Sequence, residues 1–117
     1  MAHMHHSGGI VEAVLELGFD QVKYFEGDIG TSATCFSITP PARRLIVNNK
    51  SQTGNLYLRV DGQNAQASTS FVPGDNIKIV PGANFTMDFD ALHSISLIAD
   101  AAAVHAEGIL GWKGTVG

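Results

Sequence analysis

The sequence predicts an all-β protein that forms a single antiparallel β-sandwich, jelly-roll-like or immunoglobulin-like, with about 8–10 short strands. Residues that favour turns (Gly, Pro, Asn and Asp) recur at short, fairly regular intervals along most of the chain. The segments between these turns have the length of strands, and most are rich in β-branched and aromatic residues. A chain of 117 residues is long enough for one domain with one hydrophobic core.

The N-terminal segment divides into two parts. Residues 1–9, MAHMHHSGG, resemble a flexible leader or a tag, and the histidines of this tract lack the carboxylates or cysteines that would favour a metal site. We assign the single β-sandwich domain to residues 10–117. Residues 10–19 fit a short helix, an arm or an edge strand, and the alternatives stay open. Ile10 and Val14 fall on an apolar stripe there, which must be buried in the domain or against a partner.

Eight segments read as strands, because several of them alternate between apolar and polar residues. The segments are QVKYFEG, TSATCFSI, RRLIVNN, LYLRVDG, STSFV, NIKIVPG, FTMDFD and SISLIA. In LYLRV, Leu56, Leu58 and Val60 share one face, which leaves Tyr57 on the other. Pro-Gly pairs at 73–74 and 81–82 suit type II turns on either side of NIKIV. Residues 48–55 read as an exposed polar loop of a hairpin between RRLIV and LYLRV.

The stretch from residue 94 to residue 112, SISLIADAAAVHAEGILGW, fits either one buried helix or two strands. A helix over residues 98–110 would contain Gly108 near its end, and only Asp100 offers an N-cap. Two strands with a turn at residues 100–102 fit the alternation of Ile95 and Leu97 better. We favour this hairpin, while the helix stays the alternative.

The charge of the chain excludes one large class of functions. Its net charge is −4 with a pI near 5.6, and Arg43-Arg44, its one adjacent basic pair, would point to opposite faces of a strand. Nucleic-acid binding, which needs a clustered basic surface, is therefore not expected. We also expect no membrane partner and no secretory signal, because no apolar run approaches the length of a membrane span and no charged segment precedes an apolar one at the start.

No residue pattern indicates catalysis, a metal or a cofactor. Cys35, the single cysteine, lies in an apolar-leaning strand and is expected to be a buried structural thiol. His93 and His105 read as ordinary surface or half-buried histidines. Asp88 and Asp90 share a solvated strand face. The phosphate-binding glycine patterns and the Cys or His metal motifs are absent from the sequence, so we predict no catalytic residues and no enzyme.

Aromatic residues offer the remaining candidates for a contact surface. Tyr57 is the best exposed candidate, because it points away from the apolar face of its strand. Trp112 closes the last predicted strand. Together with Ile10 and Val14, these residues are our candidates for contact with a ligand or a partner. An exposed aromatic surface would favour the alternative function, a β-sandwich module that binds carbohydrate or a cell surface.

The order of segments from residue 41 to residue 112 resembles the small β-sandwich structural proteins of tailed bacteriophages, such as capsid decoration, head-fibre and tail accessory proteins. The resemblance lies in ARRLIVNNKSQTGNLYLRVDG, FVPGDNIKIVPGANFTMDF and HSISLIADAAAVHAEGILGW. It implies a non-enzymatic virion protein, made in the bacterial cytoplasm, that binds a capsid or tail lattice and itself. The expected partners are the major capsid or tail proteins and further copies of the chain, in a homo-oligomer that analogy makes a trimer. No catalytic residue carries over, because the family is defined by assembly.

Overall fold

The computed structural model describes residues 21–67 and 76–113, and this part of the chain is all-β. Its six strands are β1 (Gln21–Ile29), β2 (Thr34–Asn49), β3 (Leu56–Arg59), β4 (Ile77–Ile79), β5 (Asn84–Ala99) and β6 (Val104–Trp112). They form one sheet in the order β1-β6-β2-β5-β3-β4, and every neighbouring pair is antiparallel. The predicted all-β, antiparallel class is confirmed.

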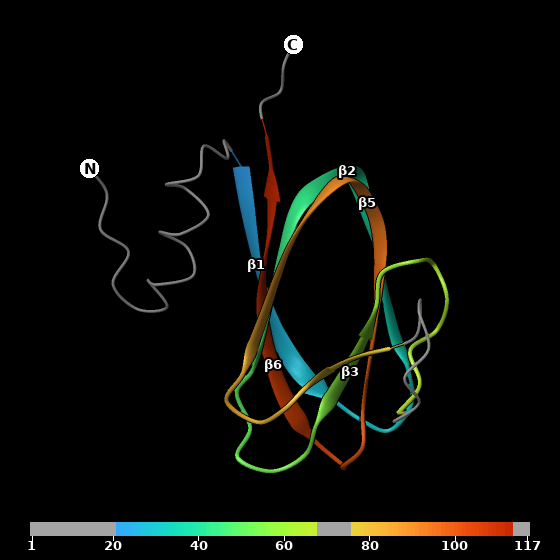
Figure 1. Cartoon of the computed structure of the whole chain (residues 1–117), viewed down its shortest axis with the longest axis vertical. Helices are drawn as coiled ribbons and strands as arrows, with labels where there is room; N and C mark the ends of the chain where they lie inside the picture. The colour runs from blue at the N-terminus through green and yellow to red at the C-terminus, as the bar shows by residue number, and fades with distance from the viewer. Residues whose placement is uncertain (1–20, 68–75, 114–117) are drawn as a thin grey trace, which may run out of the picture.

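Two of the strands, β2 and β5, are long and sharply bent. Each has 16 residues, and they pair with each other along both arms, so that together they arch over one end of the molecule (Figure 1). The pairing register shifts between Ser37 and Arg44, around Pro40-Pro41. We expected separate strands before and after these prolines, but both belong to β2. We also expected FTMDFD and SISLIA to be separate strands, but both belong to β5. Both expectations are wrong. Irregular pairing lets a ladder accommodate proline and bend without ending.

The bend divides the sheet into two halves that lie against each other. One half contains β1, β6, the second arm of β2 and the first arm of β5. The other half contains the first arm of β2, the second arm of β5, β3 and β4. Two four-stranded halves made of eight segments are the jelly-roll arrangement, one of the two that the sequence left open.

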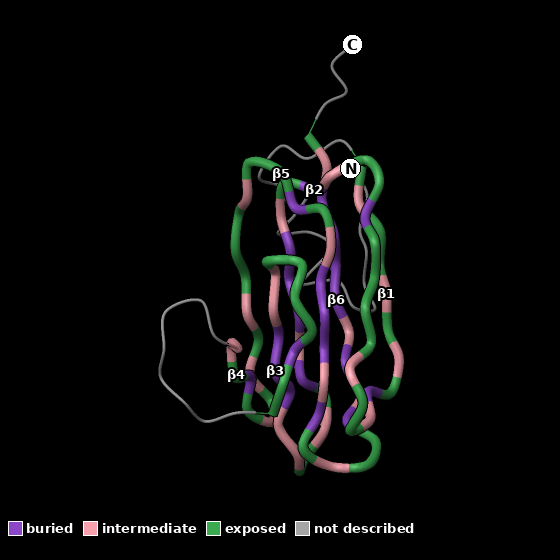
Figure 2. The backbone as a smooth tube through the Cα atoms, turned by 90° about the vertical axis from the view of Figure 1, so that its right-hand side faces the viewer, coloured by how far each residue is buried: buried purple, intermediate pink, exposed green. Residues whose placement is uncertain are grey.

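The hydrophobic core lies between these two halves (Figure 2). It consists of Ile29, Ile38, Ala42, Leu45, Val47, Leu56, Leu58, Ile79, Leu92, Ile95, Leu97, Ala99, Val104, Ala106 and Leu110. The alternation predicted for β3 is confirmed, since Leu56 and Leu58 both belong to this core. Gly108 on β6 is also required by packing, because a Cβ atom there would lie 2.3 Å from the ring of Phe25.

Residues 48–55 do not form the predicted hairpin, because β5 lies between β2 and β3 in the sheet. Asn49 holds this connection instead, and its side chain is fully buried. Its Nδ2 donates hydrogen bonds to the backbone oxygens of Gly54 (3.0 Å) and Ile79 (2.9 Å). Its Oδ1 accepts hydrogen bonds from the backbone N–H and the hydroxyl of Ser51. The polar loop is therefore anchored at its start by a buried amide.

The two strands predicted for the last stretch are confirmed, since β5 ends at Ala99 and β6 begins at Val104, but they do not pair as a hairpin, because β2 lies between them in the sheet. The turn at Pro81-Gly82 is also confirmed, with Gly82 at φ 80° and a backbone hydrogen bond from Ala83 to Val80. The predicted strand STSFV, the turn at 73–74 and the open segment 10–19 lie outside the described residues. Within the described ranges, no helix is long and apolar enough to span a membrane.

Candidate functional site

An open edge of the sheet is the first candidate site. Residues 34–39, TCFSIT, form the first arm of β2, and in the described structure this arm pairs with β5 on one side only. We call this segment the 34–39 edge. It carries no charge, and all of its residues except Ile38 are exposed. Its unpaired backbone N–H and C=O groups are available to bind another strand.

The single cysteine lies on this edge, and its predicted burial is wrong. Cys35 is exposed, because the first arm of β2 has no neighbour on its outer side within the described structure. Its thiol contacts Asn64 Oδ1 at 3.2 Å and Ser96 Oγ at 3.5 Å. None of these groups is a base of the kind that activates a nucleophilic thiol, so the geometry gives Cys35 no catalytic partner.

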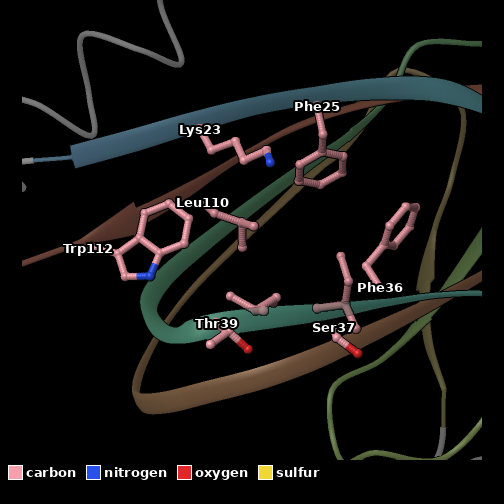
Figure 3. A pocket seen from close by; sticks show the side chains of 9 residues that line it. Lys23, Phe25, Phe36, Ser37, Thr39, Leu110 and Trp112 are labelled. Carbon is pink, nitrogen blue, oxygen red and sulfur yellow. The ribbon is translucent and has the colours of Figure 1, made fainter.

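A small apolar pocket lies directly beside the 34–39 edge (Figure 3). It has a volume of about 180 Å³, and it is lined by residues 36–39 of β2 together with Lys23, Phe25, Ile95, Leu110 and Trp112. We call it the edge pocket. The register explains how it forms, because β1 pairs with β6 and places Lys23 opposite Leu110, while the bend carries the first arm of β2 across to face them. The pocket thus lies between the rims of the two half-sheets.

Aromatic rings form much of the wall of the edge pocket. The rings of Phe25 and Phe36 lie 6.1 Å apart, one from each half of the sheet. The indole N–H of Trp112 donates a hydrogen bond of 2.7 Å to the backbone oxygen of Pro40, which holds its ring at the end of the pocket. The ammonium group of Lys23 turns toward Phe25 in Figure 3. Trp112 was a predicted contact residue, and the structure places it in this pocket.

A second candidate is a cluster of ionisable side chains on the outer face of β1 and β6. Pairing brings Asp28 opposite His105 and Glu26 opposite Glu107. His105 Nδ1 lies 2.9 Å from Asp28, and its Nε2 lies 3.3 Å from Glu26 and 3.8 Å from Glu107. We call these four residues the His105 cluster. Sequence reasoning missed it, because Asp28 on β1 and His105 on β6 are 77 residues apart in the sequence.

The electrostatics of the His105 cluster favour a protonated imidazole. The hydrogen bond to Asp28 raises the pKa of His105 above 6.5, with a further contribution from Glu26. Tyr24 donates a hydrogen bond of 3.1 Å to Glu26, and its pKa is raised to about 12 by desolvation and by the nearby carboxylates. The donor atoms of Glu26, His105 and Glu107 lie within 4.8 Å of one another, and such groups can ligate metals. In this structure the imidazole lies within hydrogen-bond distance of Asp28 and Glu26.

The remaining predicted site residues do not join either candidate. Tyr57 was expected to be exposed, but only 3% of it is accessible, and its hydroxyl lies 3.4 Å from Asp100 Oδ2. Ala65, in the connection after β3, donates its backbone N–H to Ser96 Oγ at 2.9 Å. Ile10 and Val14 lie outside the described residues.

The other polar residues that the sequence singled out lie apart from the edge pocket. His93 and Asp90 are exposed, as the sequence predicts. Asp88 is also exposed, but it forms a bidentate ion pair with Arg44, its partner across β5 and β2. Asp88 therefore takes part in a structural contact on the surface of the sheet, and it does not line the edge pocket.

Comparison with known proteins identifies a similar fold but no family. No family of known sequences and no curated protein matches the chain. A chain from a solved structure described as "Bacillus endospore appendages form a novel family of disulfide-linked pili" is similar, with a TM-score of 0.51 and 10% sequence identity. The match covers 80% of this chain and 87% of that one. At this identity the likeness concerns the fold alone. The present sequence has one cysteine, and a single cysteine per copy can form a disulfide between two copies but cannot link a longer series of copies.

Proposed function

We propose that this protein is a non-enzymatic structural subunit that associates with copies of itself through the 34–39 edge. The observation that carries the proposal is the character of that edge, which is uncharged, exposed and paired on one side only in the described structure. Natural proteins usually protect such an edge with charges, with proline or with a covering segment. An edge without these protections is expected where a strand from another molecule adds to the sheet.

The other rim beside the edge pocket illustrates the contrast. Strand β1 pairs only with β6 in the described structure, and it carries Lys23, Glu26 and Asp28 along its length. These charges discourage a second strand from pairing with β1. The same chain thus protects one rim of its sandwich and leaves the 34–39 edge unprotected, which supports a functional role for that edge.

Two further observations support an assembly role. Charged residues make up 15% of the chain, against roughly 25% in typical soluble domains, as suits a surface that neighbouring molecules partly cover. The protein of similar fold reported above comes from a structure that is described as one of pili. We further propose, from the resemblance of the sequence, that the assembly is a tailed-phage particle in which the subunit contacts a capsid or tail lattice. The carbohydrate-binding alternative loses its main support, because Tyr57 is buried.

Solution mass tests the self-association. We would measure light scattering of the full chain at two concentrations, beside the variants Ser37→Lys and Gln52→Lys. Ser37 is exposed on the 34–39 edge, whereas Gln52 is exposed in a loop away from it. We expect the wild type and Gln52→Lys to exceed the monomer mass, with a larger mass at the higher concentration, and Ser37→Lys to be monomeric because an edge lysine opposes pairing. A monomeric wild type, or a Ser37→Lys variant with wild-type mass, would contradict the proposal.

The phage assignment has a separate test. Mass spectrometry of purified phage particles from cells that express the chain should detect it in a fixed ratio to the major capsid protein. Its absence from such particles would contradict the phage assignment and would leave the self-association untouched.

A further inference from the structure

The sandwich has a second open edge on the side opposite the edge pocket, and the one charged residue on it, Asp88, is paired with Arg44 of β2. Residues 84–89, the first arm of β5, pair with the second arm of β2 and with no other described strand. We call this segment the 84–89 edge. Met87 lies on it and is 41% exposed, which makes it one of the few large apolar side chains at the surface. One edge therefore borders an apolar pocket, and the other carries an apolar projection.

We propose that the 84–89 edge of one copy pairs with the 34–39 edge of the next, and that Met87 then enters the edge pocket of that neighbour. The proposal rests on the self-association proposed above and identifies both surfaces. The two surfaces differ, so the contact is head-to-tail, and repetition gives a closed ring or an open filament. The expected trimer would be one closed form of this contact.

The two edges lie in different halves of the sheet, and each belongs to a long open stretch of strand. In the described structure, β2 has no partner on its outer side before Arg44, where pairing with β6 begins, and β5 has none before Ser96, where pairing with β3 begins. Strand β4, at the far end of the half-sheet that contains the 34–39 edge, has only 3 residues and offers a shorter ladder. Pairing between the 34–39 and 84–89 edges would thus satisfy more backbone groups than pairing with β4.

The edge pocket is suited to a methionine side chain. Its volume is about 180 Å³, and Phe25, Phe36 and Trp112 supply apolar wall that would be buried on filling. Methionine is unbranched and flexible, so it fills irregular apolar spaces well. A strand added to the 34–39 edge runs past the mouth of the pocket, because residues 36–39 belong to both.

The charges near the two surfaces also favour this contact over its alternatives. Lys23 lines the edge pocket, and the exposed Asp90 follows directly after the 84–89 edge. Opposite charges at the rim of an interface steer the partners and select the orientation.

A mixing experiment tests the head-to-tail contact. The variant Ser37→Lys has a disrupted 34–39 edge and an intact 84–89 edge. The variant Met87→Lys has an intact 34–39 edge and a disrupted 84–89 edge. Each should be monomeric alone, whereas an equimolar mixture should give a heterodimer, because one intact copy of each surface remains. Val80→Lys is the matched control, since Val80 is also apolar and exposed (47%) but lies outside both edges, and it should assemble as the wild type does.

The outcomes separate this inference from the proposed function. If the wild type assembles and Ser37→Lys does not, but Met87→Lys still assembles, self-association stands and the head-to-tail contact is overturned. If both variants are monomeric and their mixture stays monomeric, the contact is also overturned. Circular dichroism melting of each variant checks folding, and Met87→Ala provides a milder change. Because the methionine would lose most of its apolar contact, we expect self-association of Met87→Ala to weaken by about tenfold or more.

Discussion

The buried amide of Asn49 provides the sharpest test of how the fold is held together. In Asn49→Ala, the backbone oxygens of Gly54 and Ile79 lose their donor and Ser51 loses its acceptor. A buried group left without a partner costs about 1–3 kcal/mol, and each partly solvated hydrogen bond contributes about 1 kcal/mol. The bond to Ile79 is buried and the others are partly buried, so we expect a loss of about 3 kcal/mol.

For a domain of this size, that loss corresponds to a fall in Tm of about 10–20 °C. Thermal and urea unfolding followed by circular dichroism would measure it. Asn48→Ala is the matched control, because Asn48 is only half-buried, and we expect it to cost about 0.5 kcal/mol or less. If Asn49→Ala lost less than about 1 kcal/mol, the connection after β2 would not depend on this amide, and our account of it would be refuted.

Three further predictions follow from other parts of the structure. A thiol reagent should label Cys35 in the native monomer, because it is exposed, and assembly should slow the labelling; a native monomer that resists labelling would contradict the exposed edge. The stabilising contribution of His105, whose folded pKa is raised, should be complete below the ordinary histidine pKa and lost as pH rises through the folded value; His105→Asn should flatten this part of the stability–pH curve, and an unchanged curve would refute it. Gly108→Ala should destabilise the protein by about 2 kcal/mol because its Cβ would meet the ring of Phe25, whereas Gly27→Ala, with no atom within 4 Å, should unfold like the wild type.

Patterns that depend on neighbours in the sequence could be predicted well. Alternation placed Leu56 and Leu58 in the core, and the turn-forming residues after Ala99 marked the turn between the last two strands correctly. These features follow from the two-residue period of a strand and from the local chemistry of turns, so they need no knowledge of the rest of the fold. The division into strands was less predictable. A pair of prolines ends most strands. In this protein, however, Pro40-Pro41 lies within β2, at a bend where the pairing with β5 is irregular.

Exposure could not be predicted, because it depends on which strands lie at an edge and on what covers each face. Tyr57 lies on the face of β3 away from the core, as its strand pattern indicated, and yet it is buried. Cys35 lies in an apolar-leaning strand and yet is exposed, because that arm of β2 has an open edge. Both differences arise from long-range topology, which a single sequence does not reveal.

The candidate sites were hidden for the same reason. The edge pocket combines residues of β1, β2, β5 and β6, and the His105 cluster combines β1 with β6. Trp112 could be recognised as a contact candidate from the sequence, but its place in the edge pocket could not. The alternating Glu26 and Asp28 on one strand, and His105 and Glu107 on another, were visible, but only the register shows that they face each other.

The continuity of β2 and β5 across the bend has a mechanical consequence. Each strand belongs to both layers, and the ladder between them continues on both sides of the bend. The layers therefore cannot slide past each other or separate completely unless this shared ladder breaks. A load applied to either layer is carried by backbone hydrogen bonds as well as by side-chain contacts across the core, so the subunit would transmit tension as a single stiff element.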